Sequence, residues 1–214
     1  MSVRALVGVG AALARALAPC HGGGRLARER GVGRVHRLAA PRSLAVAVSL
    51  RPLAAEHLDD LTPVFDDPDV LRFTRLPVPP PPGYARTWLD RYEAGRLDGT
   101  REAFAVMDED GRFVGLALAV DIDREGREVE LGYIVAPGAR GRGVASEMLD
   151  QLTRWAFDEL GALRVTLIID VENAASSKVA ERCGYVLEGV MRSSYLKDDV
   201  RVDAGLWSRL PSDP

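Results

Sequence analysis

The hydrophobic and polar positions along the chain predict an alternation of strands and helices from residue 44 onward. Short apolar or alternating segments are typical of strands, and they lie at residues 44–50, 103–107, 112–120, 128–135, 165–169, 185–190 and 202–210. Apolar residues three or four positions apart predict helices at residues 54–65, 84–94, 144–160 and 173–184. A strand, two helices, an antiparallel meander and then an alternating tail indicate a mixed α/β domain.

Two of these predicted helices have residues that bear on where the helix continues or ends. Pro63 lies inside the first helix and can break it or make it restart, because proline removes a backbone donor. The long helix at 144–160 is expected to bury one stripe of side chains and to end at Gly161. The stripe comprises Met148, Leu152, Trp155 and Ala156.

The composition is that of a soluble globular protein with a sizeable core. The chain has 214 residues, of which 47% are hydrophobic and 28% charged. Residues 1–43 hold eight arginines and one acid, so they carry +7, and the remaining residues carry −10 of the total −3. An acidic body disfavours nucleic acid and favours cationic partners such as amines, although ordinary solubility charge gives the same balance.

The cysteines and histidines favour neither a disulfide framework nor a metal site. Cys20 and Cys183 are the two cysteines, which fits a reducing cytoplasm. No His or Cys pair has metal-ligand spacing, so no metal is expected. A serine triad could use only His57, which is expected on a surface helix without partner residues. No apolar run approaches the ~18 residues of a membrane span, so no membrane partner is expected.

Residues 1–43 differ from the rest in being rich in Arg, Ala and Gly. A signal peptide needs an unbroken apolar segment, and Arg15 interrupts this one. An organellar transit peptide is a second interpretation, because the stretch is Arg-rich and poor in acids. We expect a disordered extension or a stretch translated from an early start codon.

An Arg/Gly loop between a strand and a helix is the most informative segment. It reads Arg140-Gly141-Arg142-Gly143-Val144-Ala145 and opens directly onto the helix at 144–160. Unpaired N–H groups and partial positive charge at a helix start favour phosphate binding. Gly141 and Gly143 remove side chains that would keep a pyrophosphate from the backbone. Arg140 and Arg142 can add charge, although Arg142 can equally be a solvated surface residue.

Two common phosphate-binding motifs fit this loop poorly. A dinucleotide fold requires Gly or Ala at the third motif position, where this chain has Ser146. A P-loop requires Gly-Lys-Ser/Thr, which is absent from the sequence.

The loop instead resembles the Arg/Gln-x-x-Gly-x-Gly/Ala motif of the GNAT superfamily of N-acetyltransferases, and further segments extend the resemblance to the ribosomal-protein N-terminal acetyltransferase branch. These segments are Leu50–Leu53, Glu130–Tyr133, Asn173–Ser176, Cys183–Tyr185, Glu188-Gly189, Asp203 and Leu206-Trp207. The resemblance covers residues 46–210. It implies an α/β GNAT fold with a mixed, mostly antiparallel central sheet flanked by helices and a β-α-β-α unit that binds acetyl-CoA.

The resemblance also implies how the donor is held. The backbone of Tyr133, Ile134 and Val135 would pair with the pantetheine arm and polarise the thioester carbonyl. The residues of the loop, 140–145, would hold the pyrophosphate. Asn173 would contact the cofactor and also cap the helix that it begins.

Glu130 is the candidate general base. It lies between Val129 and Leu131 in an apolar strand, where an acid is costly unless it has a role or a partner. Such a site would raise its pKa toward the working range. A solvent-facing residue paired with an arginine is the alternative interpretation, and Glu128, on the same face of the strand, is the second choice for the base.

Ser176 is the candidate acid for the departing thiolate. Many superfamily members have a tyrosine seven residues after the asparagine, where this chain has Ala180. In the ribosomal branch a serine three residues after the asparagine fills this role, and that position is Ser176. A purely structural role is the alternative, since Asn-x-x-Ser is also a helix-start pattern. Cys183 is expected in the core and not as a nucleophile.

These residues predict direct acetyl transfer to a primary amine, without a covalent enzyme intermediate. An α-amino group is about one-tenth neutral near pH 7, whereas roughly one lysine in 2,500 is neutral. A single modest base therefore favours a protein N-terminus, and a small-molecule amine is the alternative. A non-catalytic acyl-CoA sensor is a third class, which the presence of Glu130 and Ser176 disfavours. A monomer or a homodimer is expected.

Overall fold

The computed structural model describes residues 46–214. The expected extension at residues 1–43 lies outside this part of the chain. No helix among the described residues is long and apolar enough to cross a membrane.

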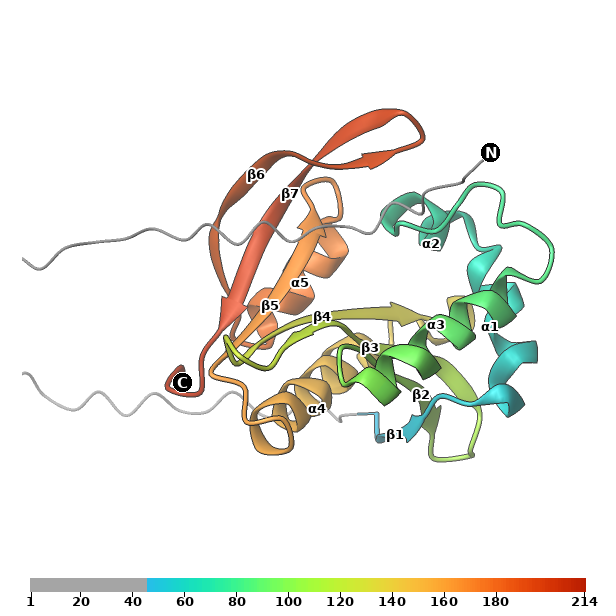
Figure 1. The fold of residues 1–214 in the computed structure, drawn as a ribbon, viewed down its shortest axis with the longest axis horizontal. Helices are drawn as coiled ribbons and strands as arrows, with labels where there is room; N and C mark the ends of the chain where they lie inside the picture. The colour runs from blue at the N-terminus through green and yellow to red at the C-terminus, as the bar shows by residue number, and fades with distance from the viewer. Residues whose placement is uncertain (1–45) are drawn as a thin grey trace, which may run out of the picture. The chain divides into compact units, whose positions relative to one another are not determined.

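A seven-stranded sheet organises the described unit, with strand order β1-β2-β3-β4-β5-β7-β6 (Figure 1). The strands are β1 (Val48–Pro52), β2 (Glu102–Asp108), β3 (Phe113–Asp123), β4 (Glu128–Val135), β5 (Arg164–Asp170), β6 (Val186–Lys197) and β7 (Val200–Arg209). β4 and β5 are parallel, and every other neighbouring pair is antiparallel. The mixed, mostly antiparallel sheet confirms the predicted fold class.

Helices cover both faces of this sheet. They are α1 (Leu58–Phe65), α2 (Pro68–Phe73), α3 (Tyr84–Asp98), α4 (Val144–Asp158) and α5 (Ala174–Arg182), with 3-10 turns at Ala55–His57 and Pro137–Ala139. One core cluster joins the sheet to α4 and α5, and the other joins it to α1, α2 and α3. Along β4, Val129 and Leu131 belong to the first cluster and Ile134 to the second. Because side chains alternate along a strand, Glu130 faces the α1–α3 side.

The helix α1 runs through Pro63 and ends two residues later. Pro63 and Asp59, whose carbonyl would pair with the missing N–H, are both exposed, so water can satisfy that carbonyl. Buried Leu61, Val64 and Phe65 hold the last turn against the core, and the helix is therefore not broken.

The long helix α4 follows its prediction closely. Met148, Leu152 and Ala156 are fully buried, and Trp155 packs against the same core cluster. The helix ends at Asp158, two residues before the expected end, and Gly161 adopts a left-handed backbone with φ 64°.

Two elements were not predicted correctly. The short helix α2 was missed, although Asp67 caps it by accepting a hydrogen bond from Val70 N at 3.0 Å. The strand β6 runs to Lys197, beyond the expected end at residue 190, because its polar second half pairs with β7.

An ion-pair cluster ties the last four strands of the sheet order together. Arg164 on β5 donates to both Glu188 oxygens at 2.6 and 2.7 Å and to Glu128 on β4 at 3.2 Å. Ser208 on β7 lies 2.5 Å from Glu188. The hydrogen bonds from Arg164 and Ser208 lower the pKa of Glu188 to about 2.

Candidate active site

Pairing between β4 and β5 stops partway along both strands. The last paired residues are Leu131 and Leu167, yet β4 continues to Val135 and β5 to Asp170. The other edge of β4 stays paired with β3 as far as Val135. Within the described sheet, residues 132–135 therefore have one edge without a strand partner, where backbone groups can bind an extended ligand.

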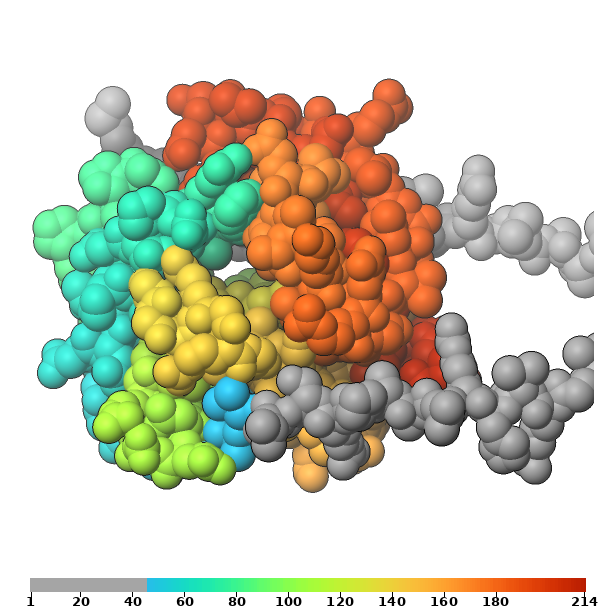
Figure 2. All heavy atoms as spheres, turned by 180° about the vertical axis from the view of Figure 1, so that it is seen from behind, coloured from blue at the N-terminus to red at the C-terminus, as the bar shows by residue number. Residues whose placement is uncertain are grey.

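The predicted donor-binding residues of β4 lie at this open edge. Ile134 is buried on the α1–α3 side, while Tyr133 and Val135 pack against the α4–α5 core. Their side chains are thus occupied by packing, and the backbone is what faces the opening. Figure 2 shows a hollow between the end of β4 with the following loop (yellow), α5 (orange) and the segment around α2 (teal).

The Arg/Gly loop leaves open space at the start of α4. Gly141 and Gly143 have left-handed backbones, with φ of 75° and 86°, and a Cβ built on either would meet nothing within 4 Å. Gly143 is the N-cap of α4 and provides no side-chain hydrogen bond. Val144 is buried and anchors the helix, while Ala145 is half-buried. An uncapped helix start beside open space fits the pyrophosphate of a coenzyme A donor.

The two loop arginines lie in different surroundings. Arg140 pairs with Asp67 at 2.5 Å and with Asp69 at 3.1 Å, which fastens the loop to the start of α2. Burial alone would raise the pKa of Asp67, but hydrogen bonds from Arg140 and from Val70 N outweigh it and lower that pKa. Arg142 is exposed.

Arg182 is a cation near the loop that the sequence interpretation missed. Its guanidinium donates to Ser146 Oγ at 3.0 Å, in the first turn of α4. Arg182 comes from the end of α5, so only the fold places it beside the phosphate-type loop.

The Glu130 side chain is half-buried on β4, and its carboxylate has no hydrogen bond or ion pair with any residue of the described chain. Burial raises its pKa, and the charges of Arg75 and Arg101 act in the opposite direction. Glu128 instead pairs with Arg164 at 3.2 Å. Of the two candidate bases, Glu130 is therefore the one whose carboxylate has no partner among the described residues.

Asn173 and Ser176 lie at the start of α5, where Asn173 is the N-cap residue. Asn173 Oδ1 accepts a hydrogen bond from Ser176 N at 3.0 Å, which confirms the predicted cap. Ser176 is half-buried, and within residues 46–214 its hydroxyl has no hydrogen-bond partner. The Tyr133 hydroxyl donates to Ser176 O at 3.5 Å, and burial raises the pKa of Tyr133 to about 12. Nothing in the strand pattern indicated that this phenol reaches α5.

Cys183 and His57 have structural surroundings. Cys183 is 8% exposed, and burial raises the pKa of its thiol to about 11, as its predicted place in the core requires. The prediction that His57 lies on a surface helix is wrong, because its side chain is buried and its Nδ1 bonds within the turn that begins at Ala54.

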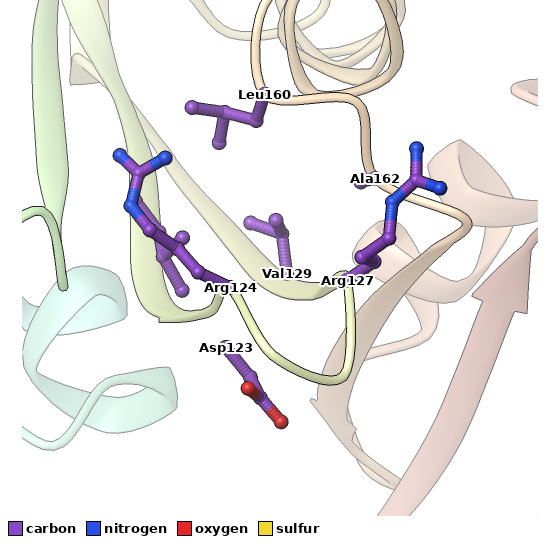
Figure 3. Close-up of a pocket in the computed structure, with 7 residues that line it drawn as sticks. Asp123, Arg124, Arg127, Val129, Leu160 and Ala162 are labelled. Carbon is purple, nitrogen blue, oxygen red and sulfur yellow. The ribbon is translucent and has the colours of Figure 1, made fainter.

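A separate pocket of about 150 Å³ lies at the turn between β3 and β4 (Figure 3). Arg124 donates to Gly99 O at 3.2 Å, and Arg127 donates to Gly161 O at 2.6 and 2.9 Å. Both guanidinium groups thus bind carbonyls just after α3 and α4, which favours a structural role.

The family profile described as the acetyltransferase (GNAT) domain matches residues 48–186. The chain therefore belongs to the GNAT acetyltransferase family, which confirms the resemblance seen in its motifs. It is an N-acetyltransferase that uses acetyl-CoA as its acyl donor.

Individual relatives support the same assignment. The uncharacterized N-acetyltransferase p20 of Bacillus licheniformis is 24% identical over 164 residues, which are 76% of this chain and 92% of the relative. The ribosomal-protein-serine acetyltransferase of Escherichia coli (strain K12) is 28% identical over 113 residues, which are 52% of this chain and 62% of the relative. The spermidine N-acetyltransferase of Vibrio cholerae, solved with CoA and spermine, has a TM-score of 0.70 at 22% identity, covering 78% of this chain and 96% of that chain. This structural likeness shows the fold.

Proposed function

We propose that this chain acetylates the α-amino group at the N-terminus of a peptide or protein, with Glu130 as the general base. The proposal rests on the half-buried Glu130 carboxylate, which has no hydrogen-bond or ion-pair partner among residues 46–214. It lies on β4 just before the strand loses its pairing with β5. This position puts the base beside the free strand edge that suits the donor.

The donor side is formed by three parts of the chain. The loop at 140–145 and the start of α4 would hold the pyrophosphate of acetyl-CoA, which supplies the acetyl group as a reactive thioester. The free backbone edge of residues 132–135 would donate hydrogen bonds to the thioester carbonyl. Asn173 would contact the donor, and the Ser176 hydroxyl would give a proton to the departing sulfur.

The acceptor side requires the amine to lose its proton. A carboxylate with a raised pKa is a better proton acceptor than an exposed one, but it remains a modest base. An α-amine has a pKa of about 7.7–8.0, so a modest base can deprotonate it more easily than it can deprotonate a lysine or a polyamine amine. The related ribosomal-protein-serine acetyltransferase is named for a protein acceptor, which supports a protein over a small-molecule acceptor.

A small-molecule amine is the second candidate acceptor. The likeness to a spermidine acetyltransferase solved with spermine favours it. The net charge of −3 also suits a cationic acceptor. Neither observation concerns the immediate surroundings of Glu130. There the positive charges of Arg75 and Arg101 act on the carboxylate, and they would repel the additional ammonium groups of a polyamine.

An acceptor panel tests the proposal. Thiol release from acetyl-CoA is measured with a peptide amide bearing a free α-amine, with the same peptide blocked at its N-terminus but carrying lysine, and with spermidine. We expect the highest kcat/KM for the free α-amine. A preference for spermidine would favour the small-molecule function, and no release with any amine would indicate a binding module.

A further inference from the structure

Arg75 lies just after α2, which packs on the side of the sheet that Glu130 faces, and no residue of the described chain neutralises its charge. It follows α2 and is exposed, and it forms no ion pair or hydrogen bond through its guanidinium within residues 46–214. Its Cζ lies 5.0 Å from the centroid of the Tyr195 ring. Stacking on an aromatic face fixes the plane of a guanidinium and leaves its N–H edge available.

The segment that carries Arg75 is fastened at both ends. Lys197 on β6 donates to Leu76 O at 2.8 Å, and Arg72 on α2 pairs with Glu172 at 3.1 Å. Figure 1 shows α2 and the tip of the β6–β7 hairpin on the same side of the described unit. These contacts tie the chain on both sides of Arg75 to β6 and to the loop before α5, and the stack on Tyr195 is what orients the Arg75 side chain.

The stacking partner of Arg75 is itself held. The Tyr195 hydroxyl donates to Asp170 Oδ2 at 3.2 Å, at the end of β5. Asp170 lies beyond the last β4–β5 pair, on the strand that borders the opening. The stack of Arg75 on Tyr195 is therefore built into the rim of the site.

Arg75 also lies close enough to Glu130 to affect it. Its charge, together with that of Arg101, opposes the effect of burial on the pKa of Glu130. Arg101 precedes β2 and shares the α1–α3 face with Ala103 by alternation. Glu128 and Asp121 act on Glu130 in the other direction, but Glu128 is paired with Arg164 and Asp121 is exposed on β3.

We infer that Arg75 is an anion subsite of the acceptor site, which selects amines that carry a carboxylate near the reacting nitrogen. This inference rests on the proposed function. For a peptide acceptor, the carboxylate is an Asp or Glu side chain at the second or third residue. A guanidinium binds a carboxylate through two parallel hydrogen bonds, whereas it repels the second ammonium of a polyamine.

The experiment uses the full chain and peptide amides that differ only at their second residue. Acceptors beginning Ala-Glu, Ala-Gln and Ala-Lys are compared with free glutamate, free glutamine and spermidine. For the wild-type chain we expect kcat/KM to fall in the order Glu, Gln, Lys at the second position. Arg75→Gln should reduce the ratio of kcat/KM for the Glu peptide to kcat/KM for the Gln peptide about three- to tenfold, since a partly exposed charge pair has a modest effect. Any effect of the lost charge on Glu130 changes all peptides alike and cancels in this ratio.

Two further variants make this result specific. Arg154→Gln removes an exposed arginine on α4, across the sheet, and should leave the Glu-to-Gln ratio of kcat/KM unchanged. Arg75→Lys keeps the charge without the planar fork, so it should restore part of the preference for Glu.

The outcomes separate the subsite from the proposed function. An unchanged Glu-to-Gln ratio of kcat/KM in Arg75→Gln would overturn the subsite alone. Free glutamate acetylated in preference to all peptides, with loss in Arg75→Gln, would support the subsite and contradict the peptide acceptor. Transfer to spermidine alone, or to no acceptor, would overturn both.

Discussion

Replacing Glu130 by Gln removes the proposed base and keeps the shape of the side chain. General bases typically contribute about 10²–10⁴-fold. Without the base, only the acceptor molecules that are already neutral can react. For an α-amine with a pKa of about 7.7–8.0, that fraction is roughly one in 50 to one in 100 at pH 6 and about nine-tenths at pH 9. We therefore expect a loss on the order of 10²-fold at pH 6 that shrinks to a few-fold at pH 9.

The same substitution should not weaken the fold. Burial raises the pKa of Glu130, so the folded chain holds this proton more tightly than the unfolded chain does. The stabilising effect of that proton is present at low pH and is lost as the pH rises through the raised pKa. At pH 7 the buried charge is a cost, and Glu130→Gln should melt no lower than the wild-type chain.

Pre-steady-state rates between pH 6 and 9, with a peptide bearing a free α-amine, measure the effect. Glu128→Gln is the matched control, because that carboxylate is already paired with Arg164. Calorimetry should show the same acetyl-CoA affinity in both variants. Wild-type turnover of Glu130→Gln at pH 6 would refute the reasoning and make Glu130 a structural residue.

Four further predictions concern the donor side and stability. Ser176→Ala should lower kcat less than Glu130→Gln, without rescue at high pH, because a thiolate is already a tolerable leaving group; an equal loss or a rescue at high pH in rapid-quench rates would contradict this. Gly143→Val should abolish acetyl-CoA binding by calorimetry, while Gly111→Val, with the same left-handed backbone and open surroundings, should lose comparable stability and still bind. Glu188→Gln should lower the free energy of unfolding by about 1 kcal/mol, or ~2–4 °C in Tm. A pKa of about 2 would imply ~3.4 kcal/mol, but the Glu188 side chain is 37% exposed and solvent screens most of that energy. The stability difference between the two chains is complete above about pH 4.5 and should disappear as the pH falls toward about 2. Removal of residues 1–43 should leave Tm and turnover unchanged, and loss of folding would show that this segment belongs to the domain.

The features that the sequence predicted well are local ones. The strand, loop and helix from Glu128 to Asp158 follow from apolar periodicity and from glycines at left-handed positions. The Asn173 cap follows from a residue that bonds three positions ahead. In each case the stabilising contacts lie within a few residues, so the sequence pattern contains them.

The features that the sequence did not predict depend on distant partners. The pairing of Arg140 with Asp67 joins positions 73 residues apart, so the sequence of the loop contains no sign of it. The second half of β6 is polar and becomes a strand through its pairing with β7. The stack of Arg75 on Tyr195 likewise exists only once the hairpin lies beside the segment after α2. Local propensity contains no information about such contacts.

The central claim is that this chain acetylates an α-amine with Glu130 as the base. One peptide with a free N-terminus and an internal lysine tests it, when it is incubated with the chain and acetyl-CoA and fragmented by mass spectrometry. We expect a single acetyl group on the N-terminal nitrogen, formed about 10²-fold more slowly by Glu130→Gln at pH 6. An acetyl group on the lysine alone, or equal rates for the two chains, would contradict it.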